Sequence, residues 1–140
     1  MNKRTALITV ILIALLGTAV LAEEAAKKSA LEVETALCSS IENRVAVGEA
    51  DSFSDDVGQV YLWTRVKGAT DTTFIKHVWY FEGEQMAEVK LNVKSKNWRT
   101  WSSKKILKEW DGTWEVKVLD SEGYTLSSIP FTVTRTPKGN

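Results

Sequence analysis

Tryptophan, arginine and small polar residues cluster at two places in this chain, around Trp63 and again from Trp98 onward. Large aromatic side chains together with cationic donors are typical of recognition surfaces. The combination suits the hydroxyls and carboxylates of a glycan, or an acidic partner peptide. The candidate binding residues are Trp63, Arg65, His77, Trp98, Arg99, Trp101, Ser102 and Lys104.

Trp63 and Arg65 alternate with an aliphatic row, so period two places them on the face less committed to a core. Two alternatives stay open: both faces are buried, or Arg65 lies across Trp63 as a cation–π pair. Trp98 and Trp101 are three residues apart and therefore lie on opposite faces of a regular strand. We expect one of them to be displayed. The alternative is that Ser102 caps a turn and the neighbouring lysines are solvated.

His77 is the only histidine of the chain. Its parity groups it with Ile75 and Trp79, so we expect it to point inward or toward a sheet rim beside Trp79, and to need a polar partner if it is buried. Arg99, Ser102 and Ser103 are the candidate partners. No Gly-x-Ser-x-Gly elbow surrounds any serine, so a hydrolase is the weakest hypothesis and no catalytic residue is predicted.

The composition narrows the classes of partner. Eighteen basic residues balance eighteen acidic ones, which argues against non-specific nucleic-acid binding. One Cys and one His rule out the usual zinc cage, and the scattered glycines form no phosphate loop. The acidic segment at residues 48–56 lacks the spacing of a calcium loop and is expected to be a solvated turn. We predict no metal and no cofactor.

The N-terminus has the layout of a secretory signal peptide over residues 1–22: Lys3 and Arg4, then an apolar run, then small residues before Glu23. We therefore expect a periplasmic or secreted protein. The alternative is an uncleaved segment that anchors it in the inner membrane, which would be its only membrane contact. In an oxidising compartment the lone Cys38 is expected to be buried and inert, with a Cys38-linked dimer as the less favoured alternative.

Short stretches with period-two patterning fill the chain after a spacer at residues 23–30. They predict an all-β, small antiparallel immunoglobulin-like sandwich of about seven strands over residues 31–134, with a flexible tail at 135–140. Trp114 is expected in the core and Trp110 across a hairpin. Helical periodicity occurs only doubtfully, around residues 103–109. The strand candidates are 31–37, 44–47, 60–66, 74–81, 87–93, 114–118 and 124–133.

Several ordered motifs resemble the bacterial family called domain of unknown function 2914. They are His77-Val78-Trp79-Tyr80, the segment 98–104, Gly112-Thr113-Trp114-Glu115-Val116, Gly123 and Phe131-Thr132-Val133, together with Cys38 and Asn43-Arg44 upstream. The sequence departs from that pattern at Val45-Ala46. The resemblance implies a small extracytoplasmic β domain and implies no reaction.

Three hypotheses for function follow. The first is a non-catalytic interaction module of the cell envelope that binds a protein or a polysaccharide through one aromatic and basic patch. The second is an accessory or assembly subunit that pairs with its partner through an edge strand. The third is a hydrolase. The patch of the first hypothesis consists of Trp63, Arg65, Trp98, Arg99, Trp101 and Lys104.

Overall fold

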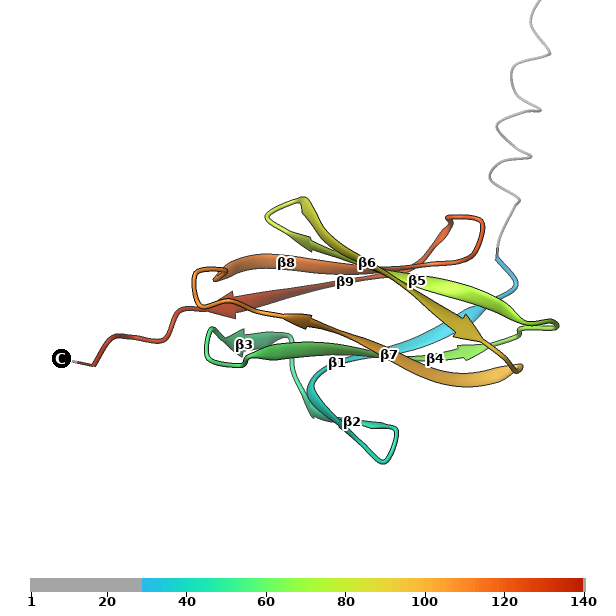
Figure 1. Ribbon diagram of the computed structural model, residues 1–140, viewed down its shortest axis with the longest axis horizontal. Coiled ribbons are helices and arrows are strands. Elements are labelled where there is room, and N and C mark those ends of the chain that lie inside the picture. Colours follow the sequence, from blue (N-terminus) through green and yellow to red (C-terminus); the bar gives the residue numbers. More distant parts are fainter. Residues whose placement is uncertain (1–28, 140) are drawn as a thin grey trace, which may run out of the picture.

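The computed structural model describes residues 29–139, so the predicted signal peptide and most of the predicted spacer lie outside the described residues. This part of the chain contains nine strands (Figure 1). They are β1 (Glu32–Glu42), β2 (Val45–Glu49), β3 (Ser52–Ser54), β4 (Gln59–Lys67), β5 (Thr73–Phe81), β6 (Glu84–Val93), β7 (Asn97–Lys105), β8 (Gly112–Leu119) and β9 (Thr125–Thr134). No helix long and apolar enough to span a bilayer occurs within the described range.

The strands form two stacked sheets (Figure 1). Sheet A has the order β2-β1-β4-β7 and sheet B the order β3-β9-β8-β5-β6. The strands β1-β4-β7 and β9-β8-β5 reproduce the A-B-E and G-F-C orders of an immunoglobulin-like sandwich. The predicted fold class is therefore confirmed. The strand count is nine instead of about seven, and one pair, β3 with β9, is parallel.

Alternation along the central strands builds the core. In β4 every second side chain is fully buried, namely Val60, Leu62, Thr64 and Val66. In sheet B, Trp79 and Trp114 are among the largest buried side chains. Trp114 stacks on Phe131 with ring centroids 5.8 Å apart, and its indole N–H donates to the carbonyl of Trp110 at 2.9 Å. The core role expected of Trp114 is confirmed.

Tight turns set the register of two hairpins. Glu82 and Gly83, with φ of 48° and 79°, connect β5 to β6. Asn43 and Arg44, with φ of 50° and 64°, connect β1 to β2. Both pairs have the left-handed backbone that a two-residue hairpin turn requires.

The structure differs from the sequence-based expectation in one segment and decides the conformation of another. The acidic segment 48–56 is not only a solvated turn, because Phe53 within β3 is buried against Phe131. The doubtful helical periodicity at 103–109 is not a helix, because β7 continues to Lys105 and Ile106 enters the core. Pairing with strands distant in sequence supplied the backbone partners that local periodicity could not reveal.

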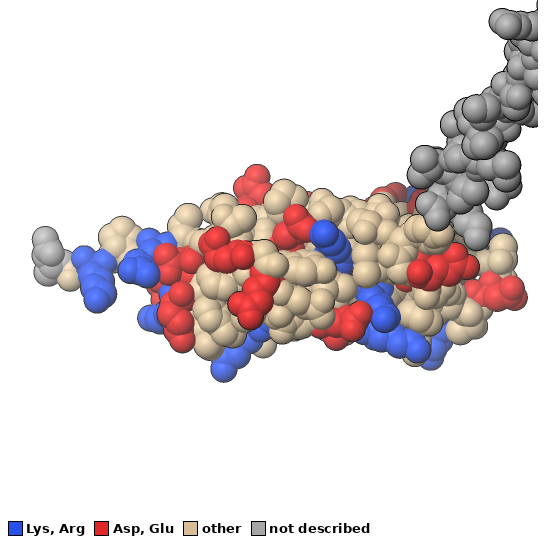
Figure 2. All heavy atoms as spheres, turned by 90° about the horizontal axis from the view of Figure 1, so that it is seen from above, with Lys and Arg blue, Asp and Glu red and all other residues tan. Residues whose placement is uncertain are grey.

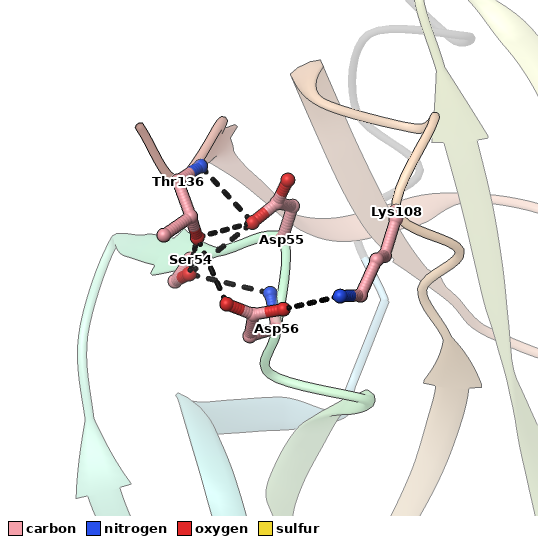
Figure 3. Close-up of polar contacts among 5 residues, drawn as sticks. All are labelled: Ser54, Asp55, Asp56, Lys108 and Thr136. Atoms are coloured by element: carbon pink, nitrogen blue, oxygen red, sulfur yellow. Dashed lines mark hydrogen bonds and ion pairs between the residues drawn. The ribbon is translucent and has the colours of Figure 1, made fainter. Parts of the chain in front are cut away.

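The start of the predicted tail is held by side chains (Figure 3). The amide N–H of Thr136 donates to a carboxylate oxygen of Asp55 at 3.0 Å, and the Thr136 hydroxyl donates to the carboxylates of Asp55 and Asp56. Arg135 forms an ion pair with Asp111 at 3.0 Å. These contacts fasten the chain after β9 to the segment after β3 and to the residue before β8.

Candidate functional site

Three consecutive residue pairs lie directly opposite one another on the outward face of β4 and β7. We call them the β4–β7 strip. They place two tryptophans opposite one another and, one pair further along, two arginines opposite one another. The pairs are Tyr61 with Ser103, Trp63 with Trp101, and Arg65 with Arg99.

Strand parity places these side chains outward. Their neighbours in β4, such as Leu62 and Thr64, are fully buried, so the residues between them must face the other side of the sheet. The same alternation in β7 buries Ser102 and leaves Ser103 exposed. Trp63 and Trp101 are half-buried, so part of each indole is open to solvent.

The strip carries cations without carboxylates of its own. Glu34, on the neighbouring strand β1, lies 3.9 Å from a terminal nitrogen of Arg65, but its closer partner is Lys67 at 2.7 Å. The hydrogen bond from Lys67 lowers the pKa of Glu34. The ion pairs formed by the described residues give Arg99 no carboxylate partner. Like charges placed directly opposite in a sheet repel, so the Arg65–Arg99 pair leaves positive charge available to an anion.

Trp63 also has a structural contact. Its indole N–H donates to the carbonyl of Arg44 at 3.0 Å, in the turn of the β1–β2 hairpin. Arg65 is oriented in a similar way, because its Nε–H donates to the side-chain oxygen of Asn97 at 2.9 Å. The cation–π contacts among the described residues involve Lys90, Lys104 and Lys117 and not Arg65. The alternative in which Arg65 lies across Trp63 is therefore not what the structure shows.

A buried polar bridge lies directly beneath the strip. His77 of β5 is fully buried, with Nε2 2.9 Å from the Thr64 hydroxyl and Nδ1 2.6 Å from the Ser102 hydroxyl. Ser102 also accepts the indole N–H of Trp79 at 3.2 Å. The bridge thus links sheet B to both strands of the strip. Thr64 lies between Trp63 and Arg65, and Ser102 follows Trp101, so the bridge fixes the backbone that positions the outward side chains.

Burial lowers the pKa of His77 to about 3 from its ordinary 6.5. The cause is desolvation, which disfavours the imidazolium. The imidazole is consequently neutral at physiological pH. The inward orientation beside Trp79 and the Ser102 partner were predicted from the sequence and are confirmed, whereas Thr64 was not predicted.

The single patch predicted from the sequence is corrected. Trp63, Arg65, Arg99 and Trp101 come together on the outward face of sheet A. Trp98 lies opposite Val66 and packs against the core, and Lys104 lies opposite Val60 with its ammonium 4.8 Å from the Trp110 ring centroid. Burial lowers the pKa of Lys104.

His77 and Ser102 are buried and cannot touch a ligand on the outward face. Tyr61 and Ser103 complete the strip but were not among the predicted site residues. Their parity with Trp63 and Trp101 was the signal that could have identified them.

Two other parts of the described structure contain reactive or charged side chains: a hollow at one end of the sandwich and the buried Cys38. At one end of the sandwich, a hollow of about 520 Å³ is bordered by Asp56 and Arg135, but Asp56 pairs with Lys108 at 3.1 Å and Arg135 with Asp111. The side chain of Cys38 is fully buried, as predicted, and burial raises the pKa of its thiol. Among residues 29–139, no three His, Cys, Asp or Glu side chains are grouped so as to hold a metal ion.

Fold and surface together define an immunoglobulin-like β-sandwich with an aromatic and cationic strip on one sheet. The model of the family described as protein of unknown function (DUF2914) matches residues 72–133, which confirms the resemblance over β5 to β9. None of the curated proteins matches the chain.

Proposed function

We propose that this protein is an exported, non-catalytic binding module of the bacterial cell envelope that recognises an envelope protein or polysaccharide through the β4–β7 strip. The carrying observation is the pairing of Trp63 with Trp101 beside Arg65 with Arg99. Half-open indoles offer contact area at low entropic cost, and guanidinium groups offer fixed donors to carboxylates. Export is supported by the signal-like segment at residues 1–22.

A binding role fits better than catalysis by the lone histidine. The imidazole of His77 is enclosed in the core and hydrogen-bonded to Thr64 and Ser102, so it has no path to a substrate proton. The strip, by contrast, is open and needs no chemical step to act.

Sedimentation with insoluble cell-envelope material tests this proposal. The protein, purified from bacteria that express the full chain, should pellet with the envelope material. The double variant Arg99→Gln/Trp101→Ala should lose about tenfold or more in affinity, because it removes a charged donor and a ring face. The matched control is Lys76→Gln/Lys117→Gln, which removes two cations from the outward face of sheet B. Equal pelleting of both double variants would overturn the role of the strip.

A second candidate function is partner pairing through the edge strand β2. Val45 and Val47 are 49% and 38% exposed there, and β2 carries no charged side chain before Glu49. Charged residues normally protect such edges from pairing with other strands. An accessory subunit that docks through β2 should lose its partner in a Val45→Lys/Val47→Lys variant, measured by the mass of the complex recovered from envelope extract. An unchanged complex would contradict this second role.

A further inference from the structure

The strip differs from an ordinary solvated sheet face in the order of its pairs. Moving along β4 and β7, the face presents a hydroxyl pair, then an indole pair, then a guanidinium pair: Tyr61 with Ser103, Trp63 with Trp101, Arg65 with Arg99. Consecutive outward pairs of an antiparallel ladder are about 7 Å apart. A ligand that engages all three must therefore be extended and must offer different chemistry at successive points.

The guanidinium pair calls for a carboxylate. Arg99 is exposed and has no carboxylate partner among the described residues. Arg65 donates its Nε–H to Asn97, and one of its terminal nitrogens lies 3.9 Å from Glu34, which is shared with Lys67. An anion placed between the two heads relieves their repulsion and accepts charge-assisted hydrogen bonds from both. Neither β4 nor β7 has an acidic residue that could supply this anion from within the face.

The indole pair distinguishes between two kinds of acidic ligand. The face of an aromatic ring is electron-rich and attracts the weakly positive C–H groups on the flat side of a sugar ring. A peptide made of acidic residues alone offers carboxylates to the arginines but has no ring face for Trp63 and Trp101. Hydroxyl groups further along a sugar chain can bond to Tyr61 and Ser103, which are both donors and acceptors.

The position of the strip favours a polymer. β7 is the edge strand of sheet A, so beyond Arg99 and Trp101 no further strand of that sheet bounds the face within the described residues. On the other side, Glu32 and Glu34 of β1 form an acidic border next to Lys67 and Arg65. That border repels carboxylates and directs an anionic chain along β4 and β7.

Resting on the proposed function, we infer that the strip binds a carboxylated polysaccharide, with a sugar ring on the Trp63–Trp101 pair and a carboxylate of the chain at the Arg65–Arg99 pair. Trp63 and Trp101 supply the ring contact, Arg65 and Arg99 the charge contact. The buried bridge of Thr64, His77 and Ser102 keeps these two contacts in register.

Binding of polygalacturonate, a polymer with one carboxylate on each sugar, tests the inference. Dextran supplies sugar rings without charge, and poly-glutamate supplies carboxylates without rings. Retardation of the protein in gels that contain each polymer gives the three affinities. We expect the tightest binding to polygalacturonate and at least about tenfold weaker binding to the other two, since each of them lacks one contact.

Two variants separate the contacts. Trp101→Ala should weaken polygalacturonate binding about tenfold and leave poly-glutamate binding unchanged, whereas Arg65→Gln/Arg99→Gln should weaken both. Lys76→Gln/Lys117→Gln is the charge-matched control and should bind like the wild type. Circular dichroism of each variant verifies that the sandwich is intact.

The outcomes separate the inference from the proposal on which it rests. Poly-glutamate binding as tight as polygalacturonate binding, with no effect of Trp101→Ala, would overturn the polysaccharide and leave an acidic protein as the partner of the strip. Binding to none of the three polymers, while envelope material still pellets the protein through the strip, would also overturn the inference alone. Failure of both assays would reject the strip as a binding site.

Discussion

The outward faces of the two sheets follow the same alternation of inward and outward residues, but they differ in whether their cations have partners within the chain. On sheet B each lysine has a partner: Lys76 lies 3.2 Å from Glu88, and Lys117 lies 3.5 Å from Glu115. Lys90 lies over the ring of Phe74 at 4.2 Å. Viewed from the side on which β6 and β8 lie, the surface shows basic and acidic groups interspersed (Figure 2).

On sheet A the β4–β7 strip pairs like with like. Trp63 lies opposite Trp101 and Arg65 lies opposite Arg99. Arg65 has Glu34 of β1 at 3.9 Å, whereas Arg99 has no carboxylate partner among the described residues. On sheet B Lys76 also lies opposite Lys90, but Lys76 forms an ion pair with Glu88 and Lys90 lies over the ring of Phe74, so each of these cations has another partner. The contrast indicates that the outward cations of sheet B are paired within the chain, whereas Arg99 on sheet A is available to an anionic partner.

The largest expected effect is the pH dependence of the free energy of unfolding caused by His77, which lies in the buried bridge beneath the β4–β7 strip. Between pH 6.5 and about 3 the imidazole of His77 is protonated in the unfolded chain and neutral in the folded one. The unfolded state then binds more protons, so the free energy of unfolding should fall by about 1.4 kcal/mol for each pH unit through this window as pH decreases.

Denaturant unfolding of the wild type and of His77→Gln, on both sides of pH 6.5, measures this slope. The variant should be less stable at neutral pH, because it disturbs the bonds to Thr64 and Ser102, but its slope just below pH 6.5 should be smaller. Parallel slopes would show that His77 does not carry the pH dependence.

An effect of intermediate size is expected when the stability change of one aromatic substitution on each outward face is compared. Trp63→Phe removes the hydrogen bond to the Arg44 carbonyl and should lower the free energy of unfolding by about 1 kcal/mol. Tyr80→Phe, on the outward face of sheet B, removes a hydroxyl that bonds to no described residue and should change stability by much less. Thermal unfolding of both variants measures the difference, and equal losses would contradict the bracing role of Trp63.

The smallest effect is the change in the free energy of unfolding when one cation is removed from each face, and its sign should differ between the faces. Arg99→Gln should raise the free energy of unfolding by about 0.5 kcal/mol at low salt, because it removes a like-charge pair. Lys117→Gln should lower it by a similar or smaller amount, because it breaks the pair with Glu115. Both differences should shrink as salt is added. If both variants shift stability in the same direction, the two faces do not differ as proposed.

The fold was largely predictable because period-two patterning is a local property of the chain. The alternation in residues 60–66 and 114–118 identified β4 and β8 and assigned Trp114 to the core. β3 was missed because three residues are too few to show a period, and its parallel partner β9 lies about eighty positions away in the sequence.

The candidate site was predictable only in part. Parity established that Trp98 and Trp101 lie on opposite faces, but could not state which of them is displayed. That choice depends on the register of β7 against β4, in which Trp98 meets the buried Val66 and Trp101 meets Trp63. The contact between Thr64 and His77 could not be predicted from the sequence either, because it joins two different sheets and no local pattern shows how the sheets stack.

By itself the sequence determined seven of the nine strands, all but β3 and β7, together with the inward row of the central strands and the residue types available for binding. These features depend on neighbours two positions apart. Only the tertiary structure decided that four of the predicted residues share one surface while Trp98, Ser102, Lys104 and His77 face inward or lie in the core. The physical reason is that cross-strand register places residues beside one another through backbone hydrogen bonds between distant segments.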